Sequence, residues 1–369
     1  MGARVVEGAV PVWLSCCLPI RGICDRTWGC AVHVAGVDGG TTKTIALVAD
    51  EQGHILGASR GPGSNCTGDD VEQPMGVVAD TVRQALRQAG LRGQEIALAA
   101  LGLAGADWPE DYTRRQAALE RQAIAQQVLV KNDALVGLRA GTQRPYGVVI
   151  AAGTGTNTGI VTPDGREYLY GYYASYGGAG DIAEEALHAV LREEDGRGPP
   201  TALTRIVLER CGYPSAEALL RGLGARKLAR GALHSLCPLV FEAAAAGDDV
   251  AAEIIVKQGL ALAEYATAAI RRFCMQGLEF DVVLAGSVFK GCGPLLVDTI
   301  TQAVHRVAAR AHIVRAMFEP AVGGVLLAYD ALGLAVSREM YANLAQTAPA
   351  HDFFDTADGG GLSVGYSPR

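Results

Sequence analysis

Apolar positions along the chain fall into short runs of strand length and longer stretches of helical spacing, which follow each other in a regular order. Three strand-like runs come first, at residues 32–37, 44–50 and 54–60. A helical stretch follows at 70–90, and strands and helices then alternate at 95–103, 109–122, 128–131 and 134–140. A three-stranded meander followed by this alternation is the order of an RNase H-like domain.

The same order begins again at residue 146. Strand-like runs occupy 146–152, 157–161 and 166–170, and a long helical region covers 181–277. A buried strand at 280–285, another helix, a strand at 312–315 and a long final helix from about residue 322 complete the unit. The pattern predicts an α/β protein with two RNase H-like domains, at residues 32–145 and 146–347. The last helix is a candidate to pack back on the first domain.

Each predicted domain carries a turn of glycine and threonine between its first two strands. The turns are Asp38-Gly39-Gly40-Thr41-Thr42-Lys43-Thr44 and Gly153-Thr154-Gly155-Thr156. Glycine lets backbone N–H groups approach a phosphate closely. A strand follows each turn, which excludes the Walker loop and the dinucleotide fingerprint, because both need a helix there. Two such turns predict a clamp for a nucleotide, although each alone could be an ordinary glycine turn.

Composition narrows the class of function. The chain has 369 residues, of which 49% are hydrophobic, enough to fill the cores of two domains. Its net charge of -7 favours neither a nucleic-acid groove nor a polybasic membrane anchor, and no apolar run is long enough to span a bilayer. The nine cysteines form no CxxC pair, which fits a cytoplasmic protein without a disulfide framework or zinc site.

Both ends of the chain differ from the rest. Residues 8–20 are mildly apolar but contain two prolines and lack the basic segment and cleavage site of a signal peptide. We expect residues 1–31 to be a non-native or disordered extension from a start codon assigned too early, with Val32 or Val34 as the true start. Residues 348–369, rich in aspartate and glycine, are expected to be a disordered tail.

Four motifs occur in the order and at the spacing of one known family. They are the turn that begins at Asp38, Asn132-Asp133-Ala134, Gly153-Thr154-Gly155-Thr156-Asn157 and Leu284-Ala285-Gly286-Ser287-Val288-Phe289. Together with Glu319-Pro320-Ala321-Val322-Gly323-Gly324, they resemble the N-acetylglucosamine kinase branch of the BadF/BadG/BcrA/BcrD ATPase family, over residues 32–345. The resemblance implies an actin-like ATPase fold around a nucleotide cleft, with ATP, Mg²⁺ and a homodimer.

The resemblance also assigns the nucleotide contacts. Backbone groups of Gly39, Gly40 and Thr41 and the Thr42 hydroxyl would face the terminal phosphates, while Asp38 would hold Mg²⁺ through water. The turn at 153–156 would be the second phosphate loop. Gly286 and Ser287 would form the adenosine turn. Lys43 is either a phosphate contact or a solvated residue, and Gly323-Gly324 either approaches the nucleotide or packs against a strand.

Asp133 is the candidate general base. It follows a predicted strand and starts a helix, so its carboxylate would point into the cleft. The family uses this position to accept the proton of the sugar hydroxyl that attacks the γ-phosphoryl group. The alternative role is a helix N-cap. Sugar contacts are expected from Asn65, Asn132, Gly171 and Tyr172. Asp107 is expected to be a turn or cap residue.

The predicted sugar pocket departs from the family pattern. Members usually carry Gly-Trp-Gly and then Gly-Asp-Glu-Gly-Ser, whereas this chain has tyrosine at Tyr172 and lacks both acidic residues near Gly178 and Ala179. Asp181 and Glu184 there fit a capping box of the next helix. The sequence therefore leaves open which amino sugar is the acceptor and which hydroxyl is phosphorylated.

We expect an ATP-dependent kinase that phosphorylates an amino sugar such as N-acetylglucosamine or glucosamine. The alternative is a BadF-type ATPase activator, or a nucleotide or sugar sensor, without sugar phosphorylation. An activator would carry a cysteine for an iron–sulfur cluster beside the second phosphate loop, where Ala151 and Ala152 stand. An RNase H-type nuclease would need three or four clustered carboxylates, and only Asp38 and Asp133 qualify.

Overall fold

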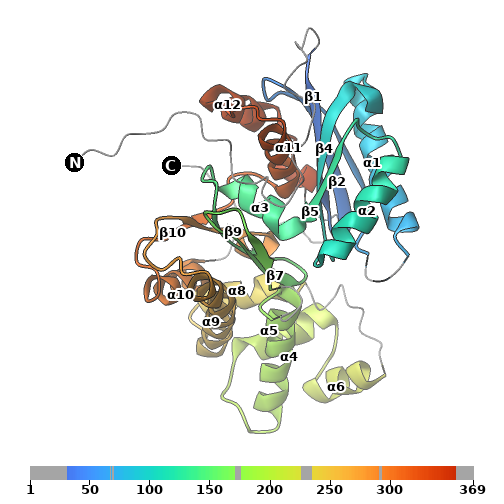
Figure 1. Ribbon diagram of the computed structural model, residues 1–369. Coiled ribbons are helices and arrows are strands. Elements are labelled where there is room, and N and C mark those ends of the chain that lie inside the picture. The colour runs from blue at the N-terminus through green and yellow to red at the C-terminus, as the bar shows by residue number, and fades with distance from the viewer. Residues whose placement is uncertain are drawn as a thin grey trace, which may run out of the picture.

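The computed structural model describes residues 31–66, 68, 70–170, 176–225, 235–290 and 293–354. Two sheets with helices around them form two lobes, joined near the middle of the molecule (Figure 1). Within the described residues, no helix combines the length and apolar character that crossing a bilayer requires.

The first sheet pairs its strands in the order β3-β2-β1-β4-β5. The strands are β1 (His33–Gly39), β2 (Lys43–Asp50), β3 (Ile55–Pro62), β4 (Ile96–Leu103) and β5 (Val128–Asn132). β1 is antiparallel to β2 and parallel to β4, so the meander and the crossover strands share one sheet. Helices cover both faces, which explains why β4 is apolar at every position.

The second sheet repeats this topology, with the order β10-β9-β6-β7-β8. Its strands are β6 (Gly147–Ala152), β7 (Thr156–Val161), β8 (Glu167–Leu169), β9 (Asp281–Ala285) and β10 (His312–Arg315). β6 corresponds to β1, because it is antiparallel to β7 and parallel to β9. The predicted pair of RNase H-like folds is thereby confirmed.

The helices are distributed unequally between the lobes. Those before residue 146 are α1 (Glu72–Ala89), α2 (Pro109–Arg121) and α3 (Asp133–Gly141). Those before β9 are α4 (Ala179–Glu194), α5 (Ala202–Cys211), α6 (Ala216–Gly224), α8 (Cys237–Ala245) and α9 (Asp249–Arg272). The last are α10 (Pro294–His305), α11 (Pro320–Ala331), α12 (Arg338–Thr347) and α13 (His351–Phe354).

Glycines in the left-handed region explain where two predicted helical stretches are interrupted. The region expected at 181–277 is divided into separate helices, and Gly212 (φ +71°) ends α5 while Gly247 (φ +94°) precedes α9. The single final helix expected from residue 322 is instead α11 and α12, separated after Gly333 (φ +72°). Only glycine adopts such angles at little cost, so each one breaks the run of helical backbone.

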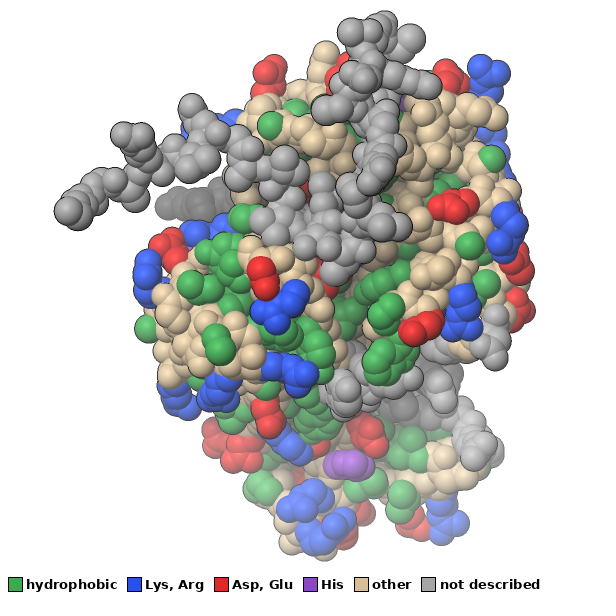
Figure 2. All heavy atoms as spheres, in the orientation of Figure 1, with side chains coloured by type: hydrophobic (Ala, Val, Ile, Leu, Met, Phe, Trp, Pro, Cys, Tyr) green, Lys and Arg blue, Asp and Glu red, His purple; other side chains and the backbone are tan. Residues whose placement is uncertain are grey.

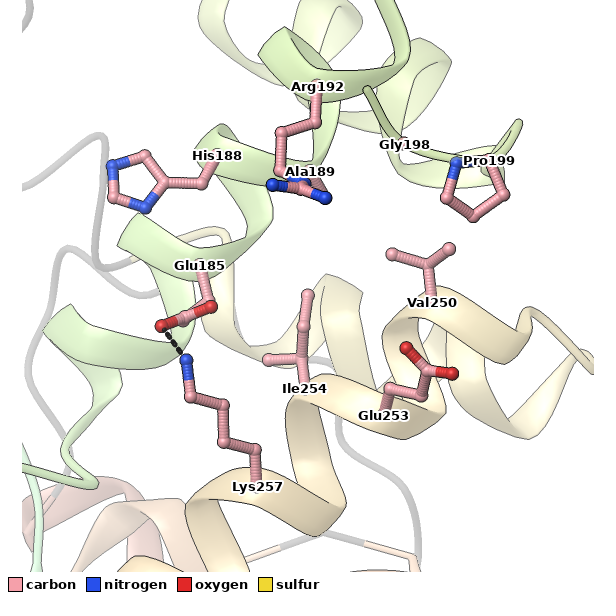
Figure 3. A pocket seen from close by; sticks show the side chains of 10 residues that line it. All are labelled: Glu185, His188, Ala189, Arg192, Gly198, Pro199, Val250, Glu253, Ile254 and Lys257. Atoms are coloured by element: carbon pink, nitrogen blue, oxygen red, sulfur yellow. Dashed lines mark hydrogen bonds and ion pairs between the residues drawn. The ribbon is translucent and has the colours of Figure 1, made fainter. Parts of the chain in front are cut away.

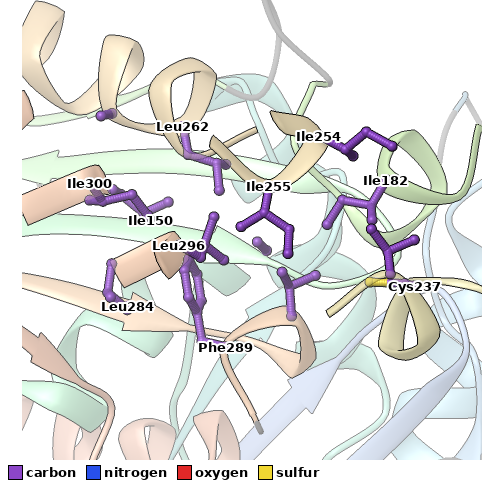
Figure 4. Packing of buried hydrophobic residues seen from close by; sticks show 14 of the residues in the cluster. Ile150, Ile182, Cys237, Ile254, Ile255, Leu262, Leu284, Phe289, Leu296 and Ile300 are labelled. Carbon is purple, nitrogen blue, oxygen red and sulfur yellow. The ribbon is translucent and has the colours of Figure 1, made fainter. Parts of the chain in front are cut away.

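Three buried clusters hold the molecule together. One lies between the first sheet and helices α1 and α2, and another fills the second lobe around α9 and α10, where Ile255 and Leu296 pack against Ile150 (Figure 4). The third is shared by the lobes: it joins α3 and α11 to residues of both sheets, among them Val34 and Val283. The junction is therefore packed core, and α3 lies at its centre.

Helix α11 follows the second lobe in sequence but packs on the first sheet. A Cβ on Gly36 of β1 would lie 2.3 Å from the backbone nitrogen of Val325, and one on Gly324 would lie 2.9 Å from the Gly36 Cα. A Cβ on Gly323 would lie 2.2 Å from the carbonyl oxygen of Val136. Of the two roles considered for Gly323-Gly324, these contacts favour packing.

The C-terminal boundary differs from the expected one. Residues 351–354 form α13, and Phe354 is 4% exposed within the shared core. The expectation of disorder from residue 348 is therefore wrong for this segment, because two adjacent phenylalanines give it apolar surface to bury. The remainder of the expected tail and residues 1–30 lie outside the described residues.

Candidate active site

The turn between β1 and β2 is the tip of a hairpin. The Gly40 N–H donates to the carbonyl of Lys43 at 2.9 Å, which closes the turn. The loop after β3 supports it, because Asn65 Nδ2 donates to the Thr41 hydroxyl at 3.1 Å. Thr41 and Thr42 are exposed. The tip thus has a fixed base and accessible hydroxyl groups, as a phosphate loop requires.

Asp38 stands at the carboxyl end of β1, directly before the glycines of the tip. Burial and the nearby Asp133 raise the pKa of its carboxyl to about 7, and Lys43 opposes that rise. Burial in turn lowers the pKa of the Lys43 ammonium. A carboxyl that resists ionisation in the free protein gains strongly from a nearby cation, which favours its charged form.

The second glycine-threonine turn joins β6 and β7, and Thr154 and Gly155 are exposed on it. Gly286, at the end of β9, lies against its base. A Cβ on Gly286 would be 2.3 Å from the carbonyl oxygen of Ala152, and its φ is +101°, so only glycine fits. The structure thus brings together the predicted second phosphate loop and the predicted adenosine turn, whose Ser287 is also exposed.

The loop before α4 packs on this second turn. The Ala179 N–H donates to the carbonyl of Gly153 at 2.9 Å. Asp181 Oδ2 accepts from the N–H groups of Gly177 and Gly178 at 3.0 Å each. The predicted capping pair is corrected here, because the helix begins at Ala179 and Asp181 is its third residue. The region without the family's acidic residues therefore serves, in this chain, to anchor the second turn.

Asn132, at the end of β5, is the N-cap residue of α3. Its Oδ1 accepts from the N–H of Ala134 at 2.9 Å. Asp133 Oδ1 shares that donor, also at 2.9 Å, and its Oδ2 has no hydrogen bond to any residue that the structure describes. The N-cap alternative for Asp133 is therefore wrong. One oxygen of this partly buried carboxylate stays available for a ligand.

The Asn132 side chain is engaged on every side. Its Nδ2 donates to the carbonyl of Ala106 at 3.1 Å and to the Asp107 carboxylate at 2.9 Å. Its Oδ1 also accepts from Asn157 Nδ2 of β7 at 3.2 Å. The amide has no hydrogen-bonding capacity left for the sugar contact expected of it. Asn132 joins β4, α3 and the second lobe, which is the work of a positioning residue.

Asp107, which was expected to be a turn or cap residue, carries a carboxyl with a raised pKa close to Asp133. Burial, and then Asp111, raise the pKa of its carboxyl. Burial brings the pKa of Asp133 to about 6, and Asp107 adds to that rise. Two carboxyls with raised pKa values at one site are typical of acid–base chemistry. The position of Asp107 in the sequence could have indicated this role. β4 and β5 are neighbouring parallel strands, so the residues that follow them meet at one edge of the sheet.

Asn65 keeps its place among the predicted sugar contacts. Its Oδ1 lies 2.7 Å from where a Cβ of Gly105 would be, so the loop after β3 touches the turn after β4. This oxygen is buried and accepts no hydrogen bond from the described residues. Buried acceptors without a partner are rare, and a ligand hydroxyl would satisfy this one. Gly171 and Tyr172 lie outside the described residues.

Two charged residues of the second half of the chain also face the first turn. Lys290 follows β9 and Glu319 precedes α11, and they pair with each other at 2.7 Å. Glu319 raises the pKa of Asp38, whereas Lys290 lowers it. The sequence alone indicates no contact of either residue with Asp38, because both lie far from it along the chain and approach it only in the fold.

The donor set around Asp38 fits Mg²⁺ held together with a nucleotide. The described residues include no group of three or more His, Cys, Asp or Glu that could hold a metal ion alone. Mg²⁺ typically keeps several waters and is bound by one or two carboxylates plus substrate phosphates. Asp38 at the base of a phosphate turn meets that requirement.

A cavity of about 200 Å³ lies elsewhere, between α4 and α9 (Figure 3). Glu185 and Lys257 form an ion pair at 2.6 Å on one side of it. It includes none of the predicted site residues, and it is smaller than the roughly 300–1,000 Å³ of typical small-molecule pockets. On the face shown in Figure 2, basic and acidic side chains are interspersed and form no continuous basic stripe.

A family model decides where this arrangement belongs. The model of the BadF/BadG/BcrA/BcrD ATPase family matches residues 35–328, which include both sheets. The chain belongs to this family. The match spans both glycine-threonine turns, the Asn132-Asp133 junction and Gly286-Ser287. The predicted family is thereby confirmed, and with it the actin-like ATPase fold with two equivalent sheets.

Individual relatives agree with this assignment. The chain is similar to an N-acetyl-D-glucosamine kinase of Dictyostelium discoideum, with 27% identity over 313 residues covering 80% of this chain and 97% of the relative. It is similar to an N-acetylmuramic acid/N-acetylglucosamine kinase of Clostridium acetobutylicum, with 25% identity covering 80% and 98%. A solved structure from Chromobacterium violaceum, described as a candidate N-acetylglucosamine kinase, has a TM-score of 0.60, with 25% identity covering 80% and 98%.

Proposed function

We propose that this member of the family is an ATP-dependent kinase that transfers the γ-phosphoryl group to a hydroxyl of an amino sugar, such as N-acetylglucosamine or glucosamine. The observation that carries the proposal is the junction of β4, β5 and α3. There Asp107 and Asp133 lie together, and Asp133 raises the pKa of Asp38 at the phosphate hairpin. Amino-sugar kinases that match almost over their whole length support the choice of acceptor.

In this proposal Asp133 acts as the general base. Its free oxygen accepts the proton of the attacking sugar hydroxyl while that hydroxyl oxygen bonds to the γ-phosphorus and the bond to the ADP oxygen breaks. A pKa of about 6 leaves the carboxylate mostly ionised at neutral pH and still basic enough to hold the proton. Asp107 orients the hydroxyl and is the second candidate for the base, because it shares the same edge of the sheet.

The two glycine-threonine turns hold the nucleotide in this proposal. Exposed Thr41, Thr42 and Thr154 present hydroxyl groups and backbone to the phosphates. Gly286 and Ser287 take the adenosine end. Asp38 would hold Mg²⁺ through water, and the ion would supply charge neutralisation on the transferring group. Asn65, whose Oδ1 lacks a partner among the described residues, binds a sugar hydroxyl.

A coupled ADP-release assay tests the function. N-acetylglucosamine, glucosamine, N-acetylmannosamine, N-acetylmuramic acid and glucose are offered with ATP and Mg²⁺, and each reaction is repeated with Asp133→Asn. ADP release that depends on one amino sugar and is lost in the variant supports the kinase. Asp195→Asn, at an exposed ion pair with Arg197, is the matched control and keeps full activity.

Two other outcomes contradict the proposal. Release of ADP without any sugar would favour an ATPase activator, and nucleotide binding without release in the whole panel would favour a sensor.

The homodimer and the cytoplasmic location expected from the sequence stay predictions. Light scattering of the purified chain tests the first of them.

A further inference from the structure

Arg115 of α2 lies at the contact between two loops of the first lobe, one with the predicted sugar contact Asn65 and the other with Asp107, which orients the sugar hydroxyl in the proposed function. It is the largest fully buried side chain among the described residues, at 2% exposure. Its Nη2 donates to the carbonyl of Cys66 and to the carbonyl of Gly105, both at 2.6 Å. One nitrogen therefore joins the loop after β3, which bears Asn65, to the turn after β4, which bears Asp107.

The remaining nitrogens of this guanidinium are unusual. Nε and Nη1 are buried and donate to no group of the described chain. No carboxylate among the described residues forms an ion pair with Arg115. A buried cation normally pairs with an anion or loses its charge, and arginine does not lose its proton in proteins. The first lobe therefore holds a buried positive charge that forms no ion pair among the described residues and lies close to Asp107 and Asp133.

Several charged or titratable groups face Asp107 and Asp133. They are Asp38 of β1 and Asp111, Tyr112 and Arg115 of α2, and Asp107 and Asp133 also act on each other. Of these groups, only Arg115 is a cation. Burial raises the pKa values of Asp107 and Asp133, and the charge of Arg115 opposes the rise at both.

We propose that Arg115 is a positioning residue for the sugar-kinase reaction, which clamps the Asn65 loop to the Asp107 turn and supplies the buried positive charge that the acidic pair faces. The inference rests on the proposed function and deepens it. The clamp sets the separation of the sugar contacts, and so acts on the affinity for the sugar. The charge favours the ionised carboxylates, and so acts on the pH dependence of catalysis.

Two substitutions separate these effects. Arg115→Lys keeps the charge but has a shorter side chain and a compact ammonium in place of the Nη2 that meets both carbonyls. It is expected to raise KM for the sugar at least 10-fold, and to leave KM for ATP and the acidic limb of the pH profile of kcat unchanged. Arg115→Met removes the charge as well. It is expected to raise KM for the sugar and move the acidic limb upward by about one pH unit.

Arg114→Met is the matched control. Arg114 is the neighbouring residue of the same helix, its side chain is 44% exposed, and it pairs with Asp111 at 3.0 Å. We expect this change to leave both KM values and the pH profile as in the wild type. Thermal unfolding of all three variants shows whether each one folds.

The outcomes distinguish failure of the inference from failure of the function. An active wild type together with an Arg115→Lys variant of unchanged sugar KM would overturn the clamp. An unmoved acidic limb in folded Arg115→Met would overturn the charge effect. If Arg115→Met fails to fold, Arg115→Gln takes its place with the same expectation for the acidic limb. A wild type that phosphorylates no sugar would instead overturn the proposed function, and this role with it.

Discussion

The two sheets have one topology but different chemistry at their edges. In the first sheet, the first strand carries Asp38 directly before its last residue, the fourth leads to Asp107 and the fifth to Asp133. In the second sheet, the first strand ends in Ala151 and Ala152, and the fourth leads to Gly286 and Ser287. At the ends of the first and fourth strands, carboxylates in one lobe therefore correspond to small neutral groups in the other.

In the proposed function, this difference assigns a different task to each lobe. Carboxylates at strand ends can bind a cation and move a proton, which phosphoryl transfer requires near the reacting oxygen. Small residues at strand ends let the backbone approach an anionic nucleotide without adding negative charge. The fold provides the same edge twice, and only the residues placed there decide which lobe carries out the chemistry.

The largest expected effect follows from replacing Asp133, the proposed base, in the first lobe. Asp133→Asn should lower kcat by about 10²–10⁴-fold, because the amide cannot accept the proton of the sugar hydroxyl. The affinity for ATP should stay as it is, because no nucleotide contact changes. Steady-state kinetics with the best acceptor of the panel measures both. A kcat within a few-fold of the wild type would transfer the base role to Asp107, whose Asn variant is measured in parallel.

A change in the second lobe should raise KM for ATP, whereas the change in the first lobe lowers kcat. Gly286→Ala places a Cβ about 2.3 Å from the Ala152 carbonyl and strains a backbone at φ +101°. We expect KM for ATP to rise at least 10-fold and KM for the sugar to stay constant. Gly277→Ala is the control, because this glycine lies outside the proposed site and no atom lies within 4 Å of its Cβ position. A rise in sugar KM of the same size would contradict the division of tasks.

Asp38 and Asp133 of the first lobe should also make the stability of the protein depend on pH. The folded protein raises the pKa of Asp38 from 3.8 to about 7, and that of Asp133 to about 6, so it holds protons that the unfolded chain has released. Its free energy of unfolding should therefore be highest near pH 4 and fall as pH rises toward 7.

Urea unfolding between pH 4.5 and 8 measures this dependence. Asp38→Asn should flatten the decline, because it removes the group with the higher pKa. Parallel curves for the wild type and this variant would show that Asp38 ionises as freely in the folded protein as in the unfolded chain.

The smallest expected effect is a change of shape. The two lobes should move toward each other when the sugar and the nucleotide are both bound. This closure should exclude water from the reaction. Lys131 pairs with Glu167 of β8 at 2.7 Å, and Asn132 contacts Asn157, so the lobes are tied beside α3 and closure should pivot there. Small-angle scattering should show a slightly smaller radius of gyration with sugar and an ATP analogue together than with either alone. An unchanged radius would contradict closure.

Much of this architecture follows from the sequence, because strand-length apolar runs and glycine-threonine turns are local signals. The hairpin at Asp38, the turn at Gly153 and the helix after Asp133 lie where the pattern places them. The predictions failed where distant segments decide. Asn132 could not be identified as a positioning residue without its partner Asn157. Glu319, Lys290 and Arg115 owe their surroundings to loops far away in the chain.

The packing of α11 on β1 has a consequence for the synthesis of the protein. All strands of the first sheet leave the ribosome before the helix that covers one of its faces. Translation from Asn132 to Pro320 takes roughly 10–40 s at typical rates. During that time the apolar side chains around Val34 and Leu47 lack their final cover. The first lobe can therefore complete its fold only after the second has been made, and a chain that stops before Pro320 would leave both lobes unfinished.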